Sequence, residues 1–82
     1  MKIKDVYEFY FKNYNKIEIT IEMIGGIRGK SKIYNYEDFK NFISPWDNEE
    51  VIQTSFERHY TYKKAIKELR DEPFLYILYK ES

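Results

Sequence analysis

Residues 25–31 read GGIRGKS and contain parts of a phosphate-binding loop. Such a loop has the pattern G-x-x-x-x-G-K-[ST], in which successive backbone N–H groups surround the phosphates and the lysine reaches them. Gly29, Lys30 and Ser31 match the end of this pattern, but its first glycine would fall at position 24, which is Ile24. The next residues, KIY, favour a strand over the helix that must open at the phosphate. We therefore interpret this segment as a structural turn that binds no nucleotide.

The turn interpretation depends on the residues before it. Residues 16–23, KIEITIEM, alternate between apolar and polar side chains, which is typical of a strand with one face in water. Gly25-Gly26 suits a two-residue hairpin turn, because glycine adopts positive φ without steric cost. A second strand is expected from about Ile27 to Tyr34, with Gly29 at a bulge.

Other candidates for catalysis are sparse. His59 is the single histidine, and it could pair with Glu57 on a metal or with Ser55, four residues earlier, as base and nucleophile. Neither pair has an obvious third member, and there is no cysteine to act as nucleophile or zinc ligand. Glu49 and Glu50 are adjacent carboxylates in a polar turn, where nothing would raise a pKa. We expect a protein that is not an enzyme and holds no metal or cofactor.

Three helices are predicted. Apolar residues with helical spacing mark residues 3–14, and Asn35 followed by two acids is an N-cap for a short helix that ends at Ser44-Pro45. The segment from Tyr62 to Arg70 is expected to form the third helix, with Ala65, Ile66 and Leu69 buried. Asp71-Glu72-Pro73 would end it.

Two further segments are expected to be strands. Residues 50–62 fit both a strand and a helix, and the content of β-branched and aromatic residues favours the strand. The nearly continuous apolar segment from Phe74 to Lys80 predicts a central strand covered on both faces. The resulting fold class is α+β, a two-layer sandwich with an antiparallel or mixed sheet of about four strands and two or three short helices, in the order α-β-β-α-β-α-β.

Composition limits the class of protein. The chain has 82 residues, enough for a single domain spanning 1–82, and its 14 basic and 14 acidic residues balance. The acids concentrate in residues 37–57 and the bases in 58–70, and we expect the two blocks to neutralise each other. The longest apolar run, residues 74–79, is far shorter than the ~20 residues of a spanning helix. With no cysteine and no signal-peptide pattern, a cytoplasmic protein without membrane contact is expected.

Binding to another protein is the function that these residues favour. Aromatic residues make up 20% of the chain, more than a small core encloses, and aromatic side chains anchor many interfaces. Trp46 lies in the acidic turn SPWDNEE, where it would either dock a basic partner or fold back onto the core. The candidate contact residues are Trp46, Asp47, Glu49, Glu50, Arg28 and Lys30.

A nucleic-acid-binding protein is the alternative. Arg28, Lys30 and Lys32 would line the predicted hairpin and follow the phosphates of a nucleic acid, although the charge balance argues against it. A homodimer is also plausible, because a small chain gains stability by sharing aromatic surface.

The two ends of the chain, KIKDVYEFYFKNYNKIEIT and FLYILYK, resemble small uncharacterised proteins encoded by phages and mobile elements of low-GC bacteria. The resemblance covers about a third of the chain and includes no functional motif, so it carries over no site residue. It implies an accessory role, such as inhibiting a host factor in the manner of anti-CRISPR proteins, or modulating transcription or replication.

Overall fold

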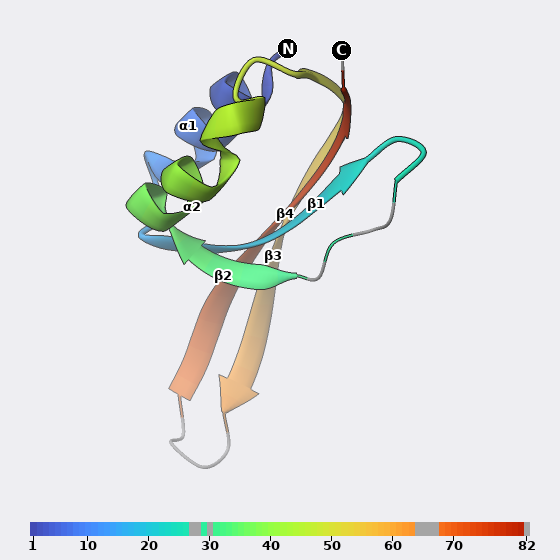
Figure 1. Ribbon diagram of the computed structural model, residues 1–82. Helices are drawn as coiled ribbons and strands as arrows, with labels where there is room; N and C mark the ends of the chain where they lie inside the picture. The colour runs from blue at the N-terminus through green and yellow to red at the C-terminus, as the bar shows by residue number, and fades with distance from the viewer. Residues whose placement is uncertain (27–28, 30, 64–67, 82) are drawn as a thin grey trace.

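The computed structural model describes residues 1–26, 29, 31–63 and 68–81, with the backbone alone in 59–63 and 68–71. Two helices lie on one side of a four-stranded sheet whose strand order is β2-β1-β4-β3 (Figure 1). The sheet is mixed, because β1 and β4 are parallel and the other pairs are antiparallel. This confirms an α+β fold with one helical layer. The elements are α1 (Ile3–Phe11), β1 (Lys16–Met23), β2 (Lys32–Asn35), α2 (Tyr36–Ile43), the 3₁₀ turn η1 (Ser44–Trp46), β3 (Glu50–Lys63) and β4 (Glu68–Lys80).

Both helices begin where the sequence predicts. The Asn35 side chain accepts a hydrogen bond from the Asp38 N–H at 2.8 Å and so caps α2. At the start of α1, the Asp5 carboxylate accepts from the Lys2 N–H at 3.2 Å. The first helix ends at Phe11, one turn before the predicted end at Tyr14. Each helix buries one side against the sheet.

The core lies between the helical layer and the two middle strands. Ile17 and Ile19 of β1 face this layer, and so does Leu75 of β4, which is paired with Ile19. The aromatic rings of α1 and α2 interlock above the strands, with the Tyr7 and Phe39 rings edge to face and 5.2 Å apart. The buried apolar residues are Ile3, Val6, Tyr7, Ile17, Ile19, Phe39, Ile43, Leu75, Ile77 and Tyr79.

The predicted pairing on either side of the glycines is confirmed, although the second strand is shorter. β1 and β2 are antiparallel, with Ile19 opposite Lys32 as the last pair of their ladder. Because the ladder ends several residues before the glycines, the two-residue hairpin predicted at Gly25-Gly26 is not seen in the described residues. Gly25 has a φ of 78°, and the Gly26 N–H donates to the Met23 carbonyl at 2.9 Å, so the turn has Ile24 and Gly25 at its centre and not Gly25-Gly26. β2 begins at Lys32 and not near residue 27. Because a strand follows Ser31, the segment does not open into a helix as a phosphate-binding loop would.

The third predicted helix, residues 62–70, is wrong. Tyr62 and Lys63 belong to β3, and they pair with Leu69 and Glu68 of β4. Residues 64–67, which include two of the predicted buried positions, lie outside the described residues. A nine-residue helix is marginal by itself, whereas continuing the ladder adds hydrogen bonds to a sheet that already exists. The expectation of a strand over residues 50–62 is confirmed.

The end of β3 (residues 58–63) pairs with the start of β4 (residues 68–73) in a two-stranded ribbon that extends beyond the other strands (Figure 1). Pro73, predicted to be a breaker, lies inside β4 opposite Arg58. The pairing between β1 and β4 begins at Phe74, so at Pro73 the strand has a neighbour on one side only. A proline is tolerated there because a missing N–H on the unpaired side breaks no ladder bond.

Candidate functional site

The side of the sheet that faces away from α1 and α2 is covered by no helix in the described parts of the chain (Figure 1). Side chains alternate along a strand, so the neighbours of the core residues point to this side. We call it the open face. The last strand, β4, is central in the sheet as predicted, but among the described residues helices cover one of its faces and not both. The open face carries Ile33, Glu18, Thr20, Glu22, Phe74, Tyr76, Leu78, Gln53, Ser55 and Glu57.

Acidic and aromatic side chains share rows across the open face. Phe74 of β4 is flanked in register by Glu18 of β1 on one side and Glu57 of β3 on the other. In the next rows, Tyr76 lies beside Thr20, and Leu78 lies beside Glu22. The aromatic and apolar side chains of the central strand are half-buried, while Glu57 is exposed. The face therefore presents an apolar centre between carboxylates.

Hydrogen bonds hold two of these carboxylates in place. The Tyr76 hydroxyl donates to Glu22 at 2.7 Å, and the Ser31 hydroxyl donates to Glu18 at 2.6 Å. A shallow depression of about 270 Å³ lies between β3 and β4 on this face and is lined by Ser55, Glu57, Phe74 and Tyr76. Carboxylates fixed in this way lose little conformational entropy when they meet a partner.

The charge of the open face is one-sided at its centre. On this face the glutamates occupy the middle of the strands, whereas Lys16 is the first residue of β1 and Lys80 is the last residue of β4. No group of three or more potential metal ligands occurs among the described residues. Carboxylates around an aromatic centre suit lysine or arginine side chains, which make ion pairs and cation–π contacts.

The acidic turn predicted as a contact site performs structural roles. The Tyr7 hydroxyl donates to the Asp47 carboxylate at 3.1 Å, and the Lys4 N–H donates to the Asp47 carbonyl at 3.0 Å. Burial, together with this hydrogen bond, raises the pKa of Tyr7 above its ordinary value. The Glu49 carbonyl accepts from the Ile3 N–H at 3.1 Å. Trp46 is half-buried against the core, with its ring 6.3 Å from that of Phe42. The turn therefore fastens α1 to the body of the protein.

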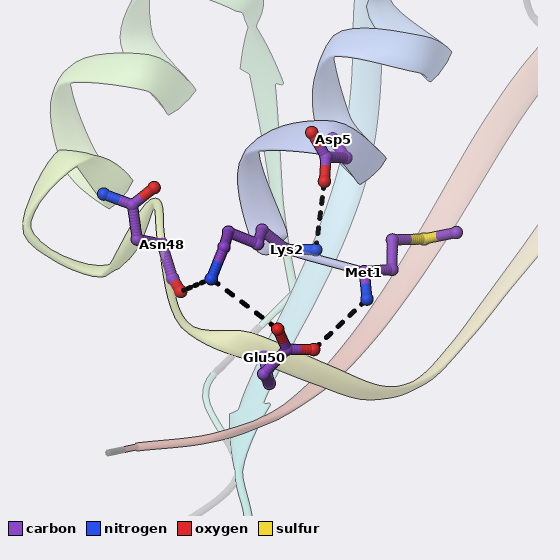
Figure 2. A network of polar contacts seen from close by, with 5 residues as sticks. All are labelled: Met1, Lys2, Asp5, Asn48 and Glu50. Atoms are coloured by element: carbon purple, nitrogen blue, oxygen red, sulfur yellow. Dashed lines mark hydrogen bonds and ion pairs between the residues drawn. The ribbon is translucent and has the colours of Figure 1, made fainter.

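Glu50 holds the start of the chain. Figure 2 shows the Met1 amine and the Lys2 ammonium on its two carboxylate oxygens, at 3.1 Å and 3.6 Å. The Lys2 ammonium also donates to the Asn48 carbonyl at 3.0 Å. Trp46, Asp47, Glu49 and Glu50 thus lie close together, and their role in binding a partner stays a prediction. Arg28 and Lys30 lie outside the described residues.

The ion pair of Glu50 predicts a pH dependence of stability. The hydrogen bond and charge of the N-terminal amine hold the pKa of Glu50 below its ordinary value. A lowered pKa in the folded state stabilises the fold above the pKa of the unfolded chain, about 4.3, and this stabilisation is lost as pH falls through the folded value. We expect Glu50→Gln to lower the melting temperature slightly at pH 7. Below about pH 3 the variant and the unchanged protein should melt together, and a difference that persists there would contradict the ion-pair explanation.

The fold and the open face define a small α+β protein in which the described helices cover one side of the sheet. The chain matches no known protein family, no curated protein and no solved structure. No helix among the described residues is long and apolar enough to cross a membrane. Function must therefore be inferred from the shape and charge of the molecule.

Sequence reasoning missed the open face as a site, although part of the signal was present. The alternation in KIEITIEM already placed Glu18 and Glu22 together on the wet side of a strand. Glu57 and Phe74 could not be joined to them, because the pairing of β1 with β4 and of β4 with β3 connects residues far apart in the sequence.

Proposed function

We propose that this protein is a non-enzymatic binding module that acts by stoichiometric contact of its open face with a basic surface of another protein. The observation that carries the proposal is the row in which Phe74 stands between Glu18 and Glu57 on the open face of the sheet. The resemblance to mobile-element proteins adds a host factor, such as a defence nuclease, as the kind of partner that this module would inhibit or modulate.

The arrangement follows the pattern of known interfaces. Aromatic side chains at the centre of a contact surface supply most of the binding free energy, and charges around them supply specificity and association rate. Phe74, Tyr76 and Leu78 form the apolar centre, and the glutamates beside them repel other acidic surfaces. The depression next to Phe74 offers space for one partner side chain. A partner with exposed lysine or arginine fits this surface best.

Nucleic acid is the second candidate, and the charges disfavour it. The glutamates of the open face repel phosphates, which excludes this face as a nucleic-acid surface. The ribbon has bases at Arg58, Lys63 and Arg70, but acids stand at Glu68, Asp71 and Glu72 along the same described stretch. The hairpin residues Arg28 and Lys30 lie outside the described residues, so a role for them with nucleic acid stays a prediction.

Matched charge variants test the proposal. A tagged protein is used to capture partners from a low-GC bacterial lysate treated with nuclease. Reversing the two charges that flank Phe74, with Glu18→Lys and Glu57→Lys, should weaken capture at least about tenfold, since like charges across an interface cost more than the ~1.4 kcal/mol that a tenfold loss requires. Raising the salt concentration should weaken capture by the unchanged protein.

The control variant has the same change in net charge on the helical layer, with Glu8→Lys and Glu37→Lys, and should capture the partner as well as the unchanged protein. Equal capture by both double variants would contradict the open face as the binding surface. Loss of the partner after nuclease treatment would favour the nucleic-acid alternative.

A further inference from the structure

The outer edge of β3 is the most extended unpaired backbone in the described part of the molecule. β3 is the last strand of the sheet, and its inner side pairs with β4 from Glu50 to Lys63. On its outer side, the pairing within the described residues is confined to its start, where Lys2 bridges Glu50 and the Val51 N–H donates to the Met1 carbonyl at 2.8 Å. From Ile52 onward, no strand pairs with this outer side among the described residues, so the edge has room for a further strand.

This edge has few of the features that normally block strand addition. Proteins protect edges with prolines, bulges, short strands and inward-pointing charges. A bulge at Ile52 and the bridge to Lys2 protect the first residues of β3. The following residues, QTSF from Gln53 to Phe56, contain no charge and no proline, and they favour strands. The features that block strand addition are therefore confined to the first residues of β3, and the residues from Gln53 to Phe56 lack them.

We propose that a second copy of this chain binds along this edge, with two β3 strands pairing antiparallel about a two-fold axis to form one continuous sheet. The inference is independent of the proposed function, because it uses the edge of the sheet and not its open face. Such an interface is isologous, so a residue on the axis lies opposite its own copy.

Charge restricts the registers in which this pairing can form. An axis at Glu57 or at Arg58 would place two like charges directly opposite each other, which destabilises a cross-strand pair. An axis at Phe56 places Glu57 opposite Ser55 and Arg58 opposite Thr54, with no like charges facing. This register pairs residues from Ile52 to Tyr60, beginning just after the part of the edge that Met1 and Lys2 occupy.

The second copy also solves a stability problem of the ribbon. A two-stranded ribbon is marginally stable in water when no further strand or helix supports it. In β4, the residues before Phe74 do not pair with β1, so this part of the ribbon has no third strand among the described residues. Pairing of two β3 strands places a third and a fourth strand beside the first residues of each ribbon. At the base of the ribbon, Phe56 is already held by the Tyr10 ring, stacked at 4.3 Å.

Sedimentation equilibrium of the unchanged full chain is the first test. A mass that rises to twice that of the monomer with increasing concentration is expected, and a monomer at every concentration would overturn the proposal.

Amide hydrogen exchange locates the interface. Alternate amides between residues 53 and 58, those on the outer edge, should become at least about tenfold more protected as the dimer forms. An increase confined to other elements would also overturn the proposal.

A pair of proline variants tests the edge directly. Successive N–H groups along a strand point to opposite sides, so one of Thr54→Pro and Ser55→Pro removes a bond to β4 and the other removes an outward N–H. The variant that keeps its bonds to β4 should fold, as judged by circular dichroism, and stay monomeric at concentrations where the unchanged protein is a dimer. A folded variant that still dimerises would place the interface elsewhere. If both variants fail to fold, the amide hydrogen exchange of the unchanged protein decides whether the outer edge of β3 is the dimer interface.

Discussion

Replacing Phe39 with alanine is expected to lower the free energy of unfolding by about 3–5 kcal/mol. The Phe39 side chain is fully buried, and its ring meets those of Tyr7 at 5.2 Å and Tyr34 at 5.0 Å, both edge to face. Its loss removes apolar contacts between both helices and the sheet and leaves a cavity among aromatic rings. A small domain has a total stability of about 5–15 kcal/mol, so much of the variant should be unfolded at 37 °C.

Phe42→Ala provides the matched control. Phe42 lies on the same helix, but 47% of its surface is exposed, and we expect a cost below about 1 kcal/mol. Urea unfolding followed by circular dichroism measures both variants. Equal losses for the two phenylalanines would contradict the position of Phe39 at the centre of the core.

The elements that the sequence predicts well are those whose signals are local. The alternation in residues 16–23 is sufficient to identify β1, because the polarity of each side chain indicates whether it points to the core or away from it. Asn35 identifies the start of α2, because the cap and the N–H group that it accepts from are three residues apart. The turn at Gly25 follows from the conformational freedom of glycine.

The elements that the sequence predicts poorly depend on contacts with residues far away along the chain. Residues 62–70 have a helical pattern, but they lie where β3 ends and β4 begins. Pairing Tyr62 and Lys63 with Leu69 and Glu68 extends the ladder between these strands, and this outweighs the helical pattern. The parallel pairing of β1 with β4 joins Glu18 to Phe74, and no local pattern reports this. For the same reason, the carboxylates of the open face could not be grouped with its aromatic rings from the sequence alone.

The acidic turn illustrates the limit of reading a site from residue types. Trp46 and the acids around it have the composition of a contact surface, but the same groups can satisfy internal partners. Asp47 accepts from the Tyr7 hydroxyl, and Glu50 binds the Met1 amine. Whether a carboxylate serves the fold or a partner is decided by which donors the chain brings to it.

The central strand offers a test that separates the two faces of the sheet. Ile77 and Leu78 are adjacent in β4, but Ile77 is fully buried under the helices and Leu78 lies half-buried on the open face, beside Glu22. Ile77→Ala should cost about 2–5 kcal/mol of stability, through lost transfer energy and a cavity. Leu78→Ala should cost less than about 1.5 kcal/mol, because no second layer of the described structure packs on its side of the sheet.

The same two variants should have the opposite ranking in binding. Leu78→Ala removes part of the apolar centre of the open face, so at a temperature where the variant is fully folded it should bind the captured partner at least about fivefold more weakly, corresponding to about 1 kcal/mol. Ile77→Ala should bind normally at temperatures where it is folded. Urea unfolding and titration of the partner measure the two quantities separately. If Leu78→Ala proved as destabilising as Ile77→Ala and left binding unchanged, the open face would be part of the folding core and not a surface for a partner.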